Sequence, residues 1–317
     1  VYAAAIGAAL YTLLTSPMRP RLGRARRVLA IAVTYASIEI VGLAVASWRW
    51  VRFLLDRDVE RDREDLLRSL RRSLRVLRTA AHRFAGLEVV MVAGPDDRVD
   101  AERELPAGPL IVCGRHGGPG GAFLLAHLLL SDYGRVPRVV LKQSLAWDPL
   151  LDALLNRLPH AFVDPDPGDG GSTASRIGLL ARGMAADDAL LIFPEGGNFT
   201  PRRRLRAITR LRRRGLFTHA ARAERLRHVL PPRPDGLFAA LEAAPESDVV
   251  FVAHTGLDHL LSAGDIWRAL PLVRPVVFTW WAVSAAEVPR QAETRLGWLE
   301  DNWARIDRWV ARNRIPM

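Results

Sequence analysis

The chain has 317 residues, about half of them apolar and a quarter charged, which fits a packed globular protein and argues against a disordered or wholly membrane-embedded one. Its formal net charge is +11, and nearly all of the positive charge is arginine because Lys142 is the only lysine, so anionic partners are expected. A single cysteine, Cys113, excludes an intrachain disulfide and a cysteine-based zinc cluster, and it fits a reducing compartment.

The N-terminal residues 1–55 consist of two apolar runs separated by an arginine-rich segment, 16–27. The first run, 1–15, carries no charge, and the second, 28–48, is interrupted only by Glu39. A helix as long as the second run can cross a hydrocarbon core of about 30 Å. We therefore predict a membrane-associated helical hairpin with 16–27 as its turn, either spanning or dipping into one leaflet. A signal peptide and a buried core hairpin are the alternatives.

Residues 56–86 are predicted to form a basic amphipathic helix. Leucines recur at three- and four-residue steps with arginines between them, at Leu66, Leu67, Leu70, Leu74 and Leu77. Contact with anionic headgroups and packing of the leucines on the protein are both compatible with this pattern.

From residue 87 to 317, short apolar runs alternate with helical ones, which predicts an α/β domain with a mostly parallel central sheet flanked by helices. The expected strands are 87–93, 109–114, 138–142, 189–194, 248–254 and 275–283. In such sheets the chemistry lies where strands end and loops begin. The C-terminal part from Glu287 reads as a helix whose tryptophans, among them Trp303 and Trp309, we expect to pack in the core.

Two strand ends carry residues suited to catalysis. One of them follows the expected strand 109–114, which runs into Arg115 and His116 and then a glycine-rich turn. A histidine can accept a proton from a hydroxyl near neutral pH. The other, 189–194, ends in the sequence Phe-Pro-Glu-Gly-Gly, in which Glu195 could hydrogen-bond a substrate hydroxyl. His254, at the end of a later strand, could line the same cleft, although a structural histidine is the better interpretation.

An arginine-rich segment follows Glu195. Between residues 202 and 233 there are twelve arginines and one acid, Glu224. These arginines could hold a phosphate, cover a bilayer surface or bind nucleic acid. Nucleic acid is not expected as a partner, because the segment has no recognisable nucleic-acid-reading motif.

Together these segments resemble the 1-acylglycerol-3-phosphate acyltransferase family and its lysophospholipid acyltransferase relatives. The family's histidine block is approximated by residues 115–121, and its Phe-Pro-Glu-Gly block is intact at 193–196. Residues 141–164 look like the block between them, and 228–237 are similar to a segment of the eukaryotic membrane-bound branch. The resemblance covers about residues 85–285 and implies a glycerolipid acyltransferase-like fold.

The resemblance implies that His116 is the general base that deprotonates the acceptor hydroxyl, with Glu195 as the second catalytic residue. It implies no metal and no resident cofactor, with acyl-CoA or acyl-carrier protein as co-substrate and a lysophospholipid as acceptor. Anionic membrane lipids are further expected partners, and the α/β domain is expected to face the cytoplasm from the inner membrane. The implied substrate-binding residues are Arg115, Gly120, Gly121, Lys142, Arg157, Phe193, Pro194, Gly196, Gly197, Arg202, Arg203 and Arg204.

The chain departs from the family pattern at position 121, where the motif aspartate is replaced by Gly121. The corresponding acid in a serine hydrolase orients the catalytic histidine, and its loss costs about 10⁴ in turnover. Either another acid takes its place, with Asp148, Asp164 and Asp258 as candidates, or activity is low or lost. The alternative to an acyltransferase is therefore a catalytically impaired lipid-binding homologue.

Overall fold

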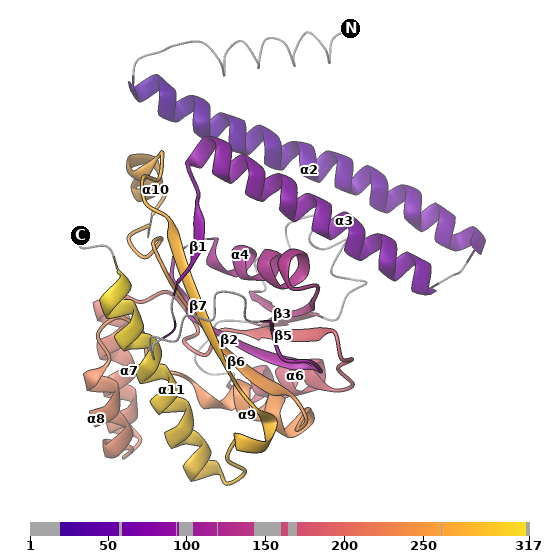
Figure 1. Cartoon of the computed structure of the whole chain (residues 1–317). Helices are drawn as coiled ribbons and strands as arrows, with labels where there is room; N and C mark the ends of the chain where they lie inside the picture. Colours follow the sequence, from indigo (N-terminus) through magenta and orange to yellow (C-terminus); the bar gives the residue numbers. More distant parts are fainter. Residues whose placement is uncertain are drawn as a thin grey trace, which may run out of the picture. The chain divides into compact units, whose positions relative to one another are not determined.

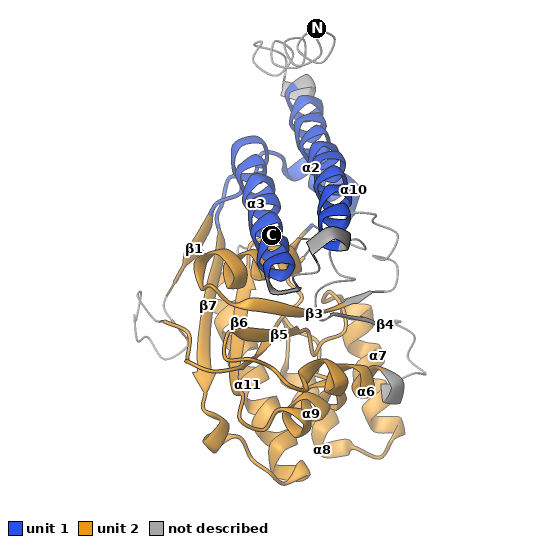
Figure 2. Ribbon diagram, turned by 90° about the vertical axis from the view of Figure 1, so that its right-hand side faces the viewer, with its two compact units in different colours: residues 1–88, 260–275 blue, residues 89–259, 276–317 orange. Residues whose placement is uncertain are grey.

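The computed structural model describes residues 20–56, 59–92, 94, 104–118, 120–142, 160–163, 170–260 and 262–314. The chain forms two compact units, one made of residues 1–88 and 260–275 and the other of residues 89–259 and 276–317 (Figure 2). Residues 260–275, which lie within the predicted α/β domain, thus group with the N-terminal helices.

The first unit is helical. It contains α2 (Pro20–Asp56), α3 (Val59–Ala80), the π-helix η1 (Ala81–Ala85) and α10 (Ala263–Ala269). The prediction of a turn over 16–27 is wrong for residues 20–27, which form the first turns of α2. Pro20 is the first residue of the helix, a position where its missing N–H costs nothing, and no later proline interrupts α2. The first apolar run, 1–15, lies outside the described residues.

Helix α2 exposes much of its apolar surface. Ile40 is 70% exposed and Trp48 is 65% exposed. Within the part of the chain that the structure describes, 23–53 is the one helical stretch long and apolar enough to cross a membrane by length and composition. At its C-terminal end α2 is joined to α3 through Arg49, whose guanidinium donates to the Asp62 carboxylate at 2.8 Å.

The predicted amphipathic helix is confirmed as α3. Leu66 and Leu67 are buried, while arginines such as Arg68 remain exposed. The leucine stripe is therefore buried at Leu66 and Leu67, and Arg68 of the same helix lies at the surface.

The second unit is built on a seven-stranded sheet of order β1-β7-β6-β2-β5-β3-β4, in which every neighbouring pair is parallel except β6 and β7 (Figure 1). The strands are β1 (Val89–Met91), β2 (Leu110–Gly114), β3 (Val136–Lys142), β4 (His160–Val163), β5 (Asp188–Ile192), β6 (Asp248–Thr255) and β7 (Val276–Val283). All six predicted strands and the mostly parallel sheet are confirmed. Strand β4 was not predicted, because it has only four residues, begins with a histidine and so lacks a recognisable apolar run.

Helices cover both faces of this sheet. They are α4 (Gly121–His127) with the π-helix η2 (Leu128–Asp132), α6 (Gly170–Ala181), α7 (Pro201–Arg213), α8 (Phe217–Arg225), α9 (Pro234–Ala243), the 3-10 helix η4 (Ala285–Glu287) and α11 (Ala292–Asn313). Helix α4 lies on one face, and α6, α9 and α11 lie on the other (Figure 1). A hydrophobic core lies between the sheet and α11, and Ile111, Phe251, Trp303 and Trp309 are buried in it. The prediction that the C-terminal tryptophans pack in the core is confirmed for these two.

Candidate active site

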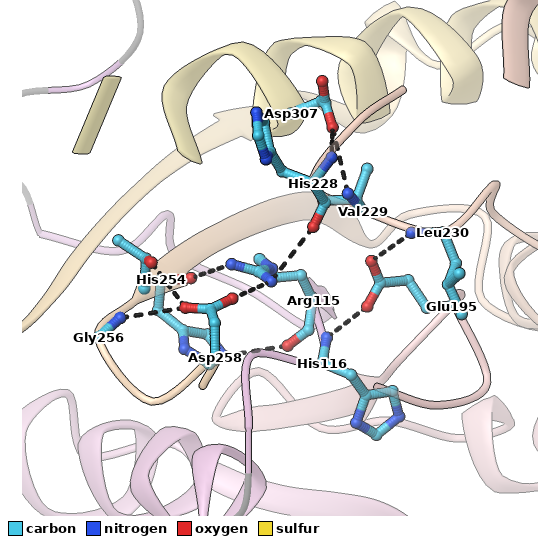
Figure 3. A network of polar contacts seen from close by, with 11 residues as sticks. Arg115, His116, Glu195, His228, Val229, Leu230, His254, Gly256, Asp258 and Asp307 are labelled. Carbon is cyan, nitrogen blue, oxygen red and sulfur yellow. Dashed lines mark hydrogen bonds and ion pairs between the residues drawn. The ribbon is translucent and has the colours of Figure 1, made fainter. Parts of the chain in front are cut away.

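The ends of β2, β5 and β6 meet at one edge of the sheet. Strand β2 lies between the other two, with Cys113 paired to Ile192 of β5 and Gly114 paired to Val252 of β6. Because all three strands are parallel, the residues that follow them come together there. His116 and Glu195, predicted from separate segments, are thereby brought into contact (Figure 3).

Glu195 holds the main chain of His116. Its Oε2 atom accepts a hydrogen bond of 2.6 Å from the backbone N–H of His116, and its Oε1 atom accepts one of 3.0 Å from the N–H of Leu230. The side chain is only 2% exposed. Burial raises the pKa of Glu195 to about 7, against the opposing charge of Arg115 and the two backbone hydrogen bonds. In this arrangement Glu195 positions two loops rather than presenting its carboxylate to a substrate hydroxyl.

Phe193 packs against the imidazole of His116. The two rings are stacked, with centroids 4.5 Å apart and an interplanar angle of 25°. The turn that follows Phe193 is closed by a hydrogen bond of 3.0 Å from the N–H of Gly196 to the Phe193 carbonyl, and Gly196 has a φ of +66°. The glycine at 196 is thus required by the turn that places both Phe193 and Glu195.

Arg115 was predicted to bind substrate, but its guanidinium lies inside the domain. The side chain is 1% exposed, and it donates to the carbonyl of His254 at 2.7 Å and to the carboxylate of Asp258. A buried guanidinium already bound to these groups cannot reach a substrate without breaking them. Arg115 therefore joins the ends of β2 and β6 beneath the His116 turn.

Asp258 was a candidate to replace the missing motif aspartate, and the structure gives its carboxylate other partners. Besides Arg115, it accepts from the Thr255 hydroxyl at 2.6 Å and from the Gly256 N–H at 3.1 Å. Burial alone would raise the pKa of Asp258, but the Arg115 charge and the Thr255 hydroxyl outweigh it and hold that pKa below its usual value. The other two candidates, Asp148 and Asp164, lie outside the described residues.

The loop that supplies the Leu230 N–H is itself held by helix α11. Asp307 of α11 accepts three backbone hydrogen bonds from consecutive residues 227–229, at 2.9, 2.6 and 3.1 Å. Figure 3 shows those from His228 and Val229. The indole N–H of Trp303 donates to the Leu230 carbonyl at 2.9 Å. The C-terminal helix thus fixes the backbone that binds Glu195, which in turn fixes His116.

Replacing Asp307 with alanine should lower the free energy of unfolding by about 2–4 kcal/mol, because it leaves three inward-facing backbone donors without their acceptor. Denaturant unfolding measures this value. Asp301→Ala is the matched control on the same helix, since the Asp301 carboxylate is 76% exposed and pairs with Arg222 at the surface. Its effect should stay below about 1 kcal/mol. Equal losses in the two variants would contradict the assignment of Asp307 to loop anchoring.

The predicted arginines on α7 have different environments. Arg202 and Arg203 are exposed, and Arg203 donates to the Asn198 carbonyl at 3.1 Å. Arg204 donates to the carbonyls of Leu226 and Glu224, both at 2.5 Å, and so ties α7 to the end of α8. Of these three side chains, Arg202 and Arg203 remain the candidates for a phosphate.

The remaining predicted substrate-binding residues that the structure describes lie at or near the carboxyl ends of the parallel strands. Pro194 and Gly197 belong to the Phe193 turn, and Gly120 precedes α4 with a φ of +81°. Gly121 is the first residue of α4. Lys142 is the last residue of β3, and Arg157 lies outside the described residues.

Arg233, the last of the twelve arginines in the segment 202–233, lies at this turn, which the sequence did not predict. Its guanidinium lies over Gly196, close enough that a Cβ there would be 3.1 Å from its central carbon, and its backbone N–H donates to the Pro194 carbonyl at 2.8 Å. Burial, with Arg210 and Arg203 nearby, lowers the pKa of Arg233. Arg233 is far from Glu195 in the chain, and the prolines before it were the only signal of a constrained loop.

The chain thus combines a mostly parallel α/β sheet with a histidine and a Phe-Pro-Glu-Gly turn at adjacent strand ends. The family model "Acyltransferase" matches residues 97–255, half of the chain, and the chain belongs to this family. The crystal structure of the 1-acyl-sn-glycerophosphate (LPA) acyltransferase PlsC from Thermotoga maritima has a similar fold, with a TM-score of 0.54 and 14% identity over 90% of this chain and 98% of that one. A comparison with curated proteins gave no match.

Proposed function

We propose that this protein transfers an acyl chain from acyl-CoA or acyl-carrier protein to a lysophosphatidate-like lysophospholipid, a step of phospholipid synthesis or remodelling. The observation that carries the proposal is the hydrogen bond of 2.6 Å between the His116 N–H and Glu195, which joins the histidine turn to the Phe-Pro-Glu-Gly turn. Membership of the acyltransferase family supports the reaction class.

The proposed step uses His116 as general base. The imidazole takes the proton from the acceptor hydroxyl as its oxygen attacks the thioester carbonyl carbon. The new ester C–O bond forms, the C–S bond breaks, and the proton passes from the imidazolium to the departing thiolate. Glu195 acts through the main chain of His116, as a positioning residue.

The test is release of free thiol from palmitoyl-CoA by the purified protein, measured with and without lysophosphatidate. Thiol release that depends on the acceptor, together with formation of phosphatidate, supports the proposal. Consumption of neither substrate would overturn it and favour a lipid-binding protein without turnover. Gly121, in place of the motif aspartate, is the observation that favours this second function.

We further propose that the protein is attached to the inner, cytoplasmic membrane through α2 and that its arginines contact anionic lipids. The exposed apolar side chains of α2 support the first part, and the basic face of α3 supports the second. Each basic residue near an anionic surface contributes about 1 kcal/mol and is screened by salt, whereas apolar burial is not.

Vesicle flotation should separate these two contributions. Binding to phosphatidylcholine vesicles should persist in 0.5 M NaCl, because salt does not screen apolar burial. Added phosphatidylglycerol should strengthen binding at a salt concentration about ten times lower, and 0.5 M NaCl should remove that gain by screening the charges. Replacing Ile40 and Val41 of α2 with aspartate should remove most of the salt-resistant binding. Val273→Asp, at a residue of the same unit that is 89% exposed, is the control and should bind as the unaltered chain does. Loss of all binding in salt would contradict attachment through α2.

A further inference from the structure

The imidazole of His254 faces Gly117 and Gly121, which follow His116 in the chain. His254 belongs to β6, its side chain is fully buried, and its ring is stacked on Phe278 with centroids 4.9 Å apart at 19°. Burial and stacking restrict movement of the ring.

The two glycines that face His254 leave no space for a side chain. A Cβ at Gly121 would be 2.9 Å from Cε1 of His254 and 3.2 Å from Nε2. A Cβ at Gly117 would be 2.5 Å from Cε1 and 2.8 Å from Nδ1. Cβ atoms essentially never approach another heavy atom more closely than 3.0 Å, so a side chain at either position would force the imidazole or the turn to shift.

The same edge is hydrogen-bonded to the residue before His116. Nε2 of His254 lies 3.0 Å from the carbonyl oxygen of Arg115. A carbonyl can only accept, so Nε2 carries the hydrogen and Nδ1 is an acceptor. Among the described residues this buried Nδ1 has no hydrogen-bond partner. Burial first, and then the charge of Arg115, lowers the pKa of His254 to about 4, so the ring is neutral at pH 7.

We propose that the His254 imidazole occupies the space into which a carboxylate at position 121 would extend, and that His254 is a positioning residue for the turn that carries His116. The effect that we expect of this pair on kcat rests on the proposed acyl transfer. Gly121 is then not simply a lost aspartate but one half of a pair with His254. Restoring the carboxylate alone is expected to harm the site, because its Cβ would collide with the ring.

A double-mutant cycle tests the pair. Kinetic constants for palmitoyl-CoA with lysophosphatidate and the midpoint of thermal unfolding are measured for the unaltered chain, Gly121→Asp, His254→Ala and the double variant. Gly121→Asp should lower kcat by at least about tenfold and lower the unfolding midpoint. In the double variant, where the ring is removed, kcat and the midpoint should exceed those of Gly121→Asp. Losses that simply add would overturn the proposal, because residues without contact behave additively.

The hydrogen bond to Arg115 is tested by two replacements of His254 that have similar volume. His254→Gln keeps an N–H that can reach the Arg115 carbonyl, whereas His254→Leu fills the space without a donor. The kcat of the glutamine variant should be about ten times that of the leucine variant, and the KM for lysophosphatidate should be unchanged. The expected difference is of this size because positioning errors of this kind cost up to 10²-fold in rate. Equal kcat values would reduce His254 to packing and overturn its positioning role.

Failure of the two proposals can be told apart. If the unaltered chain transfers no acyl group, the proposed function fails, and the pair is judged from unfolding alone. A smaller loss of unfolding midpoint from Gly121→Asp in the His254→Ala background than in the unaltered chain supports the pair. Equal losses in both backgrounds overturn it.

Discussion

His116→Ala is expected to lower kcat for acyl transfer by about 10²–10⁴-fold, the contribution of a well-placed general base. The imidazole is the group at the end of β2 that can take the proton from the acceptor hydroxyl. Its backbone is held by Glu195 at 2.6 Å and its ring by Phe193, so the substitution removes the base without removing the scaffold. KM for lysophosphatidate should change little, because the base acts mainly in the transition state.

The control for His116→Ala is His219→Ala. His219 belongs to α8, where its Nδ1 atom lies 2.7 Å from Glu300 of α11. This variant removes a histidine from the same unit and should keep kcat within about twofold, because surface substitutions away from the site have small effects. Turnover that survives His116→Ala unchanged would exclude His116 as the base, whatever the control shows.

The sequence predicts the meeting of His116 and Glu195 because both follow apolar strands, and parallel strands bring their carboxyl ends to one edge. Six of the seven strands are visible as runs of β-branched and apolar residues. Those two segments also carry two of the blocks on which the resemblance to the acyltransferase family rests. The catalytic edge of the fold is therefore encoded locally.

What holds those residues is not encoded locally. The Leu230 N–H that binds Glu195 and the Asp307 carboxylate that fixes the Leu230 loop are far apart in the chain. A backbone donor has no sequence signature, and a single acid on an amphipathic helix looks like any solvated residue. Arg115 was misassigned to substrate for the same reason, since the sequence does not show that Asp258 folds back onto it.

Gly121 illustrates the limit more sharply. From sequence, the glycine is only the absence of a motif aspartate. In the structure, the imidazole of His254 lies where a Cβ at 121 would point. The compensating residue is on another strand, so only the folded arrangement relates the two positions.

Glu195→Gln is expected to lower kcat by about 10–100-fold and to destabilise the fold, because the N–H groups of His116 and Leu230 bind different oxygens of Glu195 and a glutamine has only one oxygen. Its NH₂ would face either the His116 or the Leu230 donor, leaving that buried donor unpaired at a cost of about 1–3 kcal/mol. Displacement of the His116 backbone then misplaces the base, and errors of about 1 Å cost up to 10²-fold. Glu246→Gln, at an exposed loop residue, is the control and should change neither property.

The pH dependence of this destabilisation distinguishes a buried, partly neutral Glu195 from a charged one. Its pKa of about 7 in the fold exceeds the ordinary 4.5, so the folded chain binds the proton more tightly, and this residue lowers stability as pH rises from about 4.5 to 7. His254, whose pKa is lowered to about 4 in the fold, makes the free energy of unfolding rise with pH between about 4 and 6.5. This contribution is the same in the unaltered chain and in Glu195→Gln. The difference in free energy of unfolding between the unaltered chain and Glu195→Gln should therefore be larger at pH 5 than at pH 8. Denaturant unfolding at these pH values measures it, and a gap that widens with pH would mean that Arg115 keeps the carboxylate charged and stabilising.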